Sequence, residues 1–177
     1  DIFDREALDL IAQHGLPVNC GSLDMLAQYG ERCPGRGIML RINPGFGHGH
    51  SQKTTTGGEG SKHGIWHTQL DECLAQAKRY NLKATGLHMH IGSGTDFAHL
   101  SQVGEALIKL ALRMPDLQLI SGGGGLPTPY RPGDKPLDVD AFTKLWLGTQ
   151  ARLEKELKRK VDLEIEPGRY LVAEAGH

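Results

Sequence analysis

Three short motifs place histidine, glycine, glutamate and arginine at spacings that suit ligand binding. The first motif is His88-Met-His90-Ile-Gly-Ser93-Gly94. If it lies on a strand, His88 and His90 face the same side, because alternate residues of a strand share a face. The two imidazoles are then buried core residues, a metal-binding pair, or a surface that stacks on a flat ring. Ser93 and the glycines beside it offer hydroxyl and amide donors to an anion.

The second motif is a run of four glycines that directly follows an apolar segment, Ser121-Gly-Gly123-Gly124-Gly125. Glycine removes the Cβ atoms that would keep a phosphate away from backbone amides, so the run is a candidate phosphate site. A flexible linker is the alternative interpretation. The chain contains no GxGxxG at the start of a helix and no GxxxxGK[ST], so it has neither a dinucleotide fingerprint nor a Walker loop.

The third motif is Glu164-Ile-Glu166-Pro167-Gly168-Arg169. Glu164 and Glu166 would share one strand face, which is either the inside of a barrel or an exposed edge. A carboxylate inside a barrel needs a partner, because burying an unpaired charge is costly, and Arg169 or a cationic ligand group would serve. Paired carboxylates also occur in glycosidases. There they flank the substrate, which two residues on one strand do not do.

Arg41 lies within an apolar segment over 37–43, and a loop rich in glycine and histidine follows over 45–64. An arginine inside a buried strand is a candidate for contact with a fixed anion. A long loop inside a compact domain is often functional, with disorder as the alternative. A stacking imidazole, a glycine run and a carboxylate near arginine together fit a phosphorylated, flat, cationic heteroaromatic cofactor.

The elements that must position these motifs alternate between helix and strand patterns. Strands are predicted over 17–20, 37–43, 84–91, 117–121 and 161–166. Helices are predicted to begin after Asp4, Ser22, a Thr68–Asp71 capping box, Asp96, and Asp138 or Asp140. This alternation indicates parallel βαβ units, in a barrel or a doubly wound sheet. A barrel needs eight strands and about 250 residues, so five strands indicate a piece of a longer protein.

The composition excludes several classes of protein. The chain has 177 residues and a formal net charge of −1, so no basic surface favours nucleic acid or an anionic membrane. No apolar run approaches the roughly 18 residues that a membrane span needs. The three cysteines form no CxxC pair, which indicates a reducing, cytoplasmic compartment.

The motifs resemble those of the pyridoxal-phosphate-dependent decarboxylases with an alanine-racemase-like barrel, and in particular the diaminopimelate decarboxylase family. The similarity covers the whole chain in order, including His48-Gly-His50-Ser-Gln-Lys53 and Ser61-Lys-His-Gly64. It implies an α/β fold: a partial (β/α)8 TIM-type barrel with about strands 4 to 8. Residues 1–177 would then belong to the pyridoxal-phosphate-binding barrel domain, with the first strands and a C-terminal β-domain outside the chain.

The resemblance also implies roles for individual residues around pyridoxal 5'-phosphate. His90 would stack on the pyridine ring, and Glu166 would pair with the protonated ring nitrogen. Arg41 would lie near the phenolic oxygen of the ring. Arg169 would contact the phosphate and reach the substrate. The other cofactor-binding residues are expected around the phosphate: Ser93, Gly123, Gly124, Gly125, Pro167 and Gly168.

The implied reaction is the decarboxylation of meso-2,6-diaminopimelate to L-lysine and CO2 by a cytoplasmic homodimer. The alternatives are a decarboxylase of ornithine, arginine or carboxynorspermidine with the same cofactor, and a metal-dependent barrel hydrolase that uses His88 and His90. No catalytic residue and no metal ligand is expected within the chain, because the family's cofactor-binding lysine and proton-donor cysteine belong to other segments. The isolated chain is therefore expected to be inactive. It is also expected to fold poorly, because open barrel edges are unpaired strands.

Overall fold

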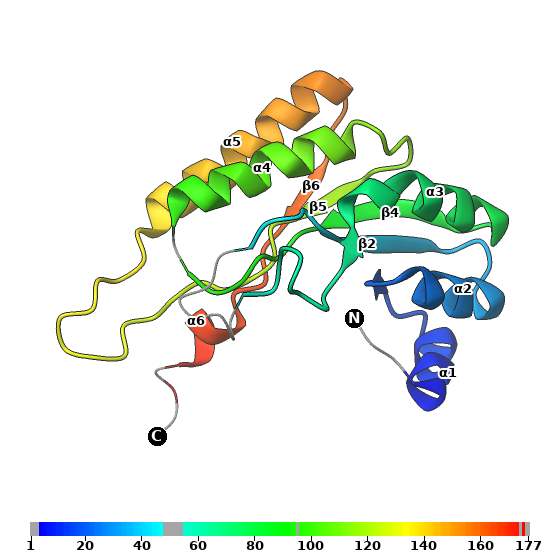
Figure 1. Ribbon diagram of the computed structural model, residues 1–177, viewed down its shortest axis with the longest axis horizontal. Helices are drawn as coiled ribbons and strands as arrows, with labels where there is room; N and C mark the ends of the chain where they lie inside the picture. The colour runs from blue at the N-terminus through cyan, green and yellow to red at the C-terminus, as the bar shows by residue number, and fades with distance from the viewer. Residues whose placement is uncertain (1–3, 48–54, 95, 174, 176–177) are drawn as a thin grey trace.

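The computed structural model describes residues 4–47, 55–94, 96–173 and 175, and shows a parallel sheet with helices packed against it (Figure 1). Its strands are β1 (Asn19–Cys20), β2 (Gly37–Asn43), β3 (Ile65–Trp66), β4 (Lys83–His88), β5 (Leu119–Ser121) and β6 (Asp162–Glu164). Within this described part the main sheet runs β1-β2-β4-β5-β6 with every pair parallel, and β3 pairs with β2. The His48–Lys53 motif lies outside the described residues.

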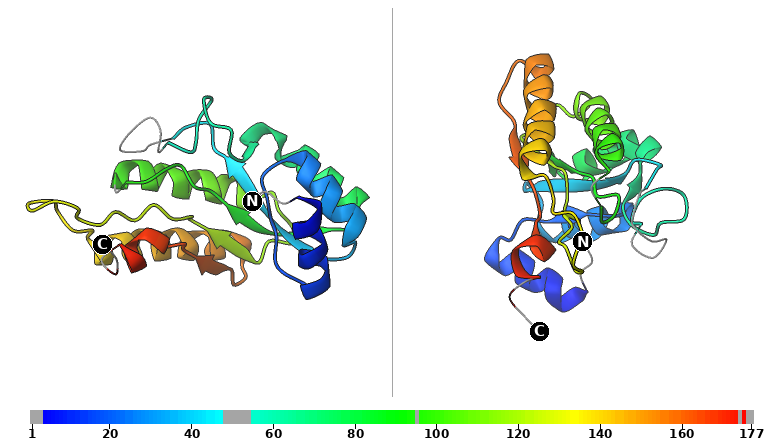
Figure 2. Two further views of the ribbon diagram at one scale, coloured as in Figure 1. Left: turned by 90° about the horizontal axis from the view of Figure 1, so that it is seen from below. Right: turned by 90° about the vertical axis from the view of Figure 1, so that its left-hand side faces the viewer.

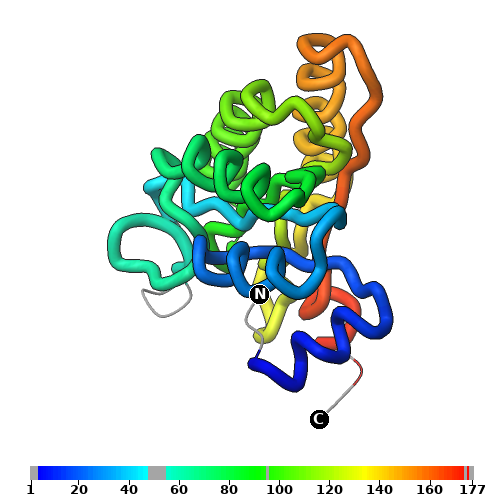
Figure 3. Tube along the Cα trace, turned by 90° about the vertical axis from the view of Figure 1, so that its right-hand side faces the viewer, coloured from blue at the N-terminus to red at the C-terminus, as the bar shows by residue number. Residues whose placement is uncertain are grey.

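The helices are α1 (Arg5–His14), α2 (Leu23–Arg32), α3 (Leu70–Arg79), α4 (Phe97–Ala111), α5 (Val139–Leu157) and α6 (Gly168–Val172). Figures 2 and 3 show α2, α3, α4 and α5 following one another around the outer side of the sheet. The side chains of Asp4, Ser22, Asp96 and Asp138 accept hydrogen bonds from amides in the first turns, as their positions predict. Among the described helices, none is long and apolar enough to cross a bilayer.

The two faces of the sheet differ, as alternate residues of β2 show. Ile38, Leu40 and Ile42 are buried in the hydrophobic core that the sheet shares with the helices, whereas Met39 and Arg41 are only half-buried. Complete burial of an aliphatic side chain contributes about 1.5–3 kcal/mol, so the helical side carries the stability of the fold. The other face lines a cavity of about 330 Å³. This is the arrangement of an open barrel segment, with helices outside and an uncovered interior.

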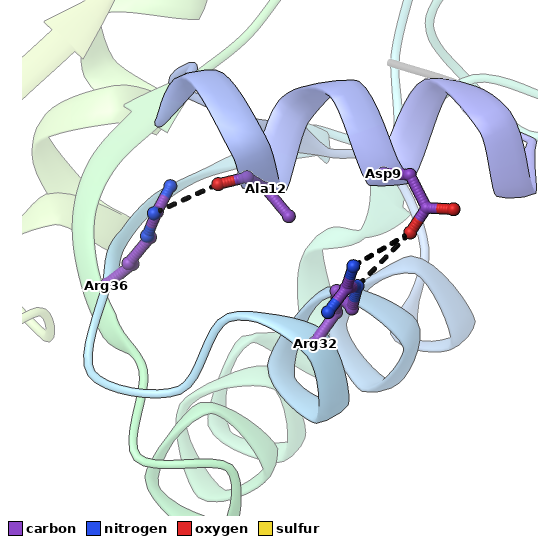
Figure 4. A network of polar contacts seen from close by, with 4 residues as sticks. All are labelled: Asp9, Ala12, Arg32 and Arg36. Atoms are coloured by element: carbon purple, nitrogen blue, oxygen red, sulfur yellow. Dashed lines mark hydrogen bonds and ion pairs between the residues drawn. The ribbon is translucent and has the colours of Figure 1, made fainter.

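α1 is the least buried of the larger helices, since none of its residues is fully buried. It is joined to α2 by an ion pair between Arg32 and Asp9 at 3.1 Å, and Arg36 donates a hydrogen bond to the carbonyl of Ala12 at 3.2 Å (Figure 4). The ion pair is more than half exposed on both sides. Because exposed pairs contribute only about 0–1 kcal/mol, these contacts orient α1 more than they stabilise it.

The structure corrects several predicted boundaries. The strand predicted over 84–91 ends at His88. Met89 still donates to the carbonyl of Ser121 in β5, but the carbonyls of His90 and Ile91 accept hydrogen bonds from Thr56 of a loop. The strand predicted over 161–166 spans only β6, which leaves Glu166 past its end. The predicted Thr68–Asp71 capping box is absent. The chain enters α3 through a 3₁₀ turn over His67–Gln69, in which Thr68 lacks the extended backbone of a capping residue.

Candidate functional site

The carboxyl ends of four neighbouring strands bring polar residues into one row. Arg41 of β2 is in register with His88 of β4, His88 with Ser121 of β5, and Ser121 with Glu164 of β6. Glu166 continues the row just past the end of β6. The carboxyl ends of parallel strands are where α/β folds bind ligands, so this row is the candidate site.

Glu166 contacts two members of this row. Its Oε1 lies 3.2 Å from Nε2 of His88 and accepts a long hydrogen bond of 3.4 Å from the Ser121 hydroxyl. Its backbone amide donates to the carbonyl of Gly123 at 2.9 Å. The interaction with His88 lowers the pKa of the Glu166 carboxyl, against an opposing effect of partial burial. The side chain is 46% exposed, so this carboxylate faces open space at the end of the sheet.

Of the two partners that the sequence left open for Glu166, Arg169 is not the one that the structure shows. Among the described residues, the Glu166 side chain contacts His88 and Ser121. Arg169 is exposed at the start of α6. Arg41 is half-buried, and burial lowers the pKa of its guanidinium while the charge of Glu166 raises it. The carboxylate of Glu166 and the guanidinium of Arg41 therefore act on each other through their charges.

His90 lies after the end of β4, on the loop that leads away from the sheet. Burial, followed by the positive charge of Arg41, lowers the pKa of its imidazole to about 4. The ring is therefore neutral near pH 7. Its partner surfaces are glycines: a Cβ on Gly123 would lie 2.7 Å from the His90 Cβ, and one on Gly125 would lie 3.1 Å from its Cε1. The structure thus brings together His90 and the glycine run, which the sequence assigned to one site.

Contacts within the protein itself require glycine in the run of residues 122–125, apart from any role in binding a ligand. Gly123 and Gly125 have φ of +69° and +89°, a left-handed conformation that favours glycine. A Cβ on Gly124 would lie 2.3 Å from the carbonyl oxygen of Glu166, and one on Gly125 would lie 2.5 Å from that of Gly92. In the described structure, the amides of Gly124 and Gly125 have no hydrogen-bond acceptor. The run therefore packs three loop segments together and leaves two donors available.

The remaining predicted site residues lie in the loop after β4 or around the start of α6, and they differ in exposure. Ser93 is half-buried in the loop after β4, and Pro167 is half-buried just before α6. Gly168 and Arg169 are exposed at the start of α6, and a Cβ on Gly168 would meet nothing within 4 Å. No neighbouring protein atom therefore requires glycine at position 168. The space beside Gly168 and the Arg169 backbone is open.

Asn43 and Thr56 were not singled out by the sequence, yet they fix the loop beside His90. The Asn43 side chain accepts hydrogen bonds from the amides of Gly45 and Gly58, and donates to the carbonyl of Gly58. The Thr56 hydroxyl donates to the carbonyl of His90 at 3.1 Å. The available signal was the position of Asn43 at a strand end before Pro-Gly, where asparagine commonly bonds to nearby backbone.

The inner face of the sheet forms the cavity below this row. Its lining includes Met39, Thr85, Leu119, Glu164 and Glu166, so the two glutamates share one face as their spacing predicted. Across the described ranges, no three histidine, cysteine, aspartate or glutamate side chains gather as metal ligands.

Residues 1–173 match the family described as "Pyridoxal-dependent decarboxylase, pyridoxal binding domain". The chain is 53% identical to diaminopimelate decarboxylase of Streptomyces coelicolor, over 99% of this chain and 40% of that protein. It is 49% identical to diaminopimelate decarboxylase of Escherichia coli K12, over 99% of this chain and 42% of that protein. The chain thus spans about two fifths of the length of these curated relatives.

Solved structures agree with this placement. A crystal structure of diaminopimelate decarboxylase, 49% identical, has a TM-score of 0.90 over 97% of this chain and 41% of that one. The Helicobacter pylori diaminopimelate decarboxylase complexed with L-lysine is 22% identical and has a TM-score of 0.83, over 97% of this chain and 44% of that one, which shows a shared fold. The predicted fold class, part of a TIM-type barrel, is confirmed. The chain belongs to the family of pyridoxal-dependent decarboxylases, in which it matches the pyridoxal binding domain.

Proposed function

We propose that this chain forms the cofactor-binding part of a decarboxylase that converts meso-2,6-diaminopimelate to L-lysine and CO2. The observation that carries the proposal is the Glu166 carboxylate. It is held anionic at the carboxyl end of a parallel sheet, with its side chain 46% exposed and the neutral His90 nearby. An anion in this position is what a protonated pyridine nitrogen requires.

The residues present fit pyridoxal phosphate in charge and shape. Glu166 offers an anion to the ring nitrogen, and His90 offers a neutral imidazole face to the ring. The amides of Gly124 and Gly125 have no acceptor among the described residues, which suits a phosphate. Open space at Gly168 leaves room for a phosphate as well. We assign Ser93, Gly123, Pro167 and Arg169 to the same phosphate region.

The bound cofactor supplies an electron sink for the pair that decarboxylation leaves on the substrate Cα. Glu166 supports this chemistry by keeping a proton at the ring nitrogen. His90 would orient the ring, the glycine amides would hold the phosphate, and Arg41 would lie near the phenolic oxygen. These residues would act by orientation and charge stabilisation. A displacement of about 1 Å in such an arrangement can lower the reaction rate roughly 100-fold. Arg169 is proposed to reach the substrate as well.

The proposal includes parts of the enzyme beyond this chain. The cofactor-binding lysine and a proton-donor cysteine are expected from other segments. The expected homodimer, the cytoplasmic location, and the assignment of residues 1–177 to the barrel domain stay predictions. The substrate is proposed from the 49–53% identity to diaminopimelate decarboxylases. Decarboxylation of ornithine, arginine or carboxynorspermidine is the competing outcome.

The test is made on the protein of full family length that carries this chain. Pyridoxal phosphate is added, visible absorption is recorded, and CO2 release is measured with meso-2,6-diaminopimelate and with the three competing amino acids. Cofactor absorption that is lost or shifted in Glu166→Ala, with CO2 released from diaminopimelate alone, supports the proposal. An absence of cofactor absorption overturns it, and a preference for another amino acid overturns the substrate. Zinc content is measured in parallel for the hydrolase alternative.

A further inference from the structure

We propose that His88 is a positioning residue that holds the Glu166 carboxylate in place through its Nε2. This inference rests on the proposed function, because it concerns how Glu166 is kept ready for a pyridine nitrogen. The sequence left His88 open as a core histidine, a metal ligand or part of a surface that stacks on a flat ring. The geometry assigns it another task, as a buried donor to the carboxylate at the centre of the site.

His88 is well placed for this task. It is only 2% exposed, lies at the end of β4 beside the neighbouring strands β2 and β5, and its Nε2 is 3.2 Å from Oε1 of Glu166. The contact is close but not well aligned, since neither ring nitrogen of His88 has a hydrogen bond of good geometry in the described structure. Such contacts in ligand-free sites often tighten when the ligand arrives. The Glu166 carboxylate is therefore the partner of the buried His88 ring.

The Glu166 carboxylate fixes which ring nitrogen of His88 donates. A carboxylate only accepts, so Nε2 must carry the hydrogen. Nδ1 is buried and has no hydrogen-bond partner among the described residues. Arg41 in register on β2, and His90 after β4, place further positive or polar groups beside the ring. His88 thus donates through Nε2, with Ser121 in register on β5 and Glu166 past the end of β6.

Glu166 needs such a partner because of its location. It lies beyond the last paired residue of β6, and its other side-chain contact is the long 3.4 Å bond from Ser121. A half-exposed glutamate without a second anchor can rotate toward water. His88 contacts Oε1 from the buried side and so restricts the carboxylate to one position at the end of the sheet. His88 accordingly acts on the reaction through Glu166 and does not itself touch the reacting atoms.

The closing experiment compares His88→Leu with His88→Gln in the full-length protein. Leucine fills the buried space without a donor, whereas the glutamine amide nitrogen restores a donor near the position of Nε2. Met89→Leu is the matched control, because Met89 is the adjacent residue and is completely buried. Melting temperatures of all variants separate loss of folding from loss of positioning.

The first readout needs no cofactor. Crystal structures of the cofactor-free proteins are expected to show the Glu166 carboxylate displaced in His88→Leu and retained in His88→Gln and Met89→Leu. An unmoved carboxylate in His88→Leu overturns the inference. This outcome is independent of the proposed function, which fails instead if the unmodified protein shows no absorption from bound pyridoxal phosphate.

The second readout is functional. We expect at least a tenfold lower kcat and weaker pyridoxal phosphate binding in His88→Leu, with values within about threefold of the unmodified protein in His88→Gln. In a Glu166→Gln background, His88→Leu should cause no further loss of cofactor affinity, because the two residues act as one unit. Equal losses in His88→Leu and His88→Gln, or additive losses with Glu166→Gln, would show that His88 only fills space.

Discussion

Replacing Gly124 with alanine tests whether the glycine run holds the site together. The new Cβ would lie 2.3 Å from the carbonyl oxygen of Glu166, whereas ordinary contacts begin at 3.4 Å. The two segments must therefore separate by about 1 Å. Gly124 does not have a positive φ, so alanine is not strained by its own backbone. The effect comes from the collision alone.

The magnitude follows from what the displacement breaks. Overpacking of this kind costs about 1–3 kcal/mol of folding free energy. The bond from Ser121 to Glu166 is already 3.4 Å long, and a further separation of the segments abolishes it. Because a misplacement of about 1 Å in a catalytic arrangement can cost roughly 100-fold in rate, we expect a loss of that order in decarboxylation.

The assay measures decarboxylation rate, pyridoxal phosphate affinity and melting temperature of the full-length protein. Gly148→Ala is the control, because Gly148 is exposed in the middle of α5 and a Cβ there meets nothing within 4 Å. Alanine in a helix is favoured over glycine by up to about 1 kcal/mol, so this variant should be as stable or more stable, with unchanged rate. A Gly124→Ala protein with unchanged rate, affinity and melting temperature would refute the reasoning.

Three further predictions concern stability, measured by chemical denaturation of the cofactor-free protein. Asp138→Ala should lower the free energy of unfolding by about 1 kcal/mol because it removes the cap of α5, whereas Asp140→Ala should change it less. The pKa of His90 is about 6.5 in the unfolded chain but about 4 in the folded protein, so the unfolded chain binds the proton first as the pH drops. The free energy of unfolding should therefore fall between pH 6.5 and pH 4. His90→Phe should remove this part of the pH dependence. Leu107→Ala should cost about 2–5 kcal/mol because Leu107 is completely buried, while the half-exposed Leu147→Ala should cost far less; equal losses would contradict the packing described.

The features that the sequence predicted correctly depend on local interactions. Ser22 and Asp96 cap their helices because a capping side chain bonds to amides two or three residues away. The parallel alternation of strands and helices follows from the periodicity of apolar residues. The Thr68 prediction is wrong for a related reason: the same residue types also occur inside a 3₁₀ turn, where the backbone conformation excludes the cap.

The candidate site was only partly predictable, because its contacts join distant segments. His90, Gly125 and Glu166 were found by their motifs, and the resemblance supplied their expected roles. The contact between His88 and Glu166 depends on strand order and register, which no local pattern contains. Asn43 was missed for the same reason, since its partner Gly58 is brought back only by the folded loop.

Leaving β3 aside, each strand of the main sheet lies beside the strand synthesised before it. A growing chain can therefore add each strand to a partner that has already emerged, without waiting for a distant segment. The carboxylate of Glu166 comes last, after His88 on β4 and Ser121 on β5 have been placed. Because β6 is the last of the described strands, the carboxylate that we propose to pair with the ring nitrogen is added only after the rest of this part of the sheet.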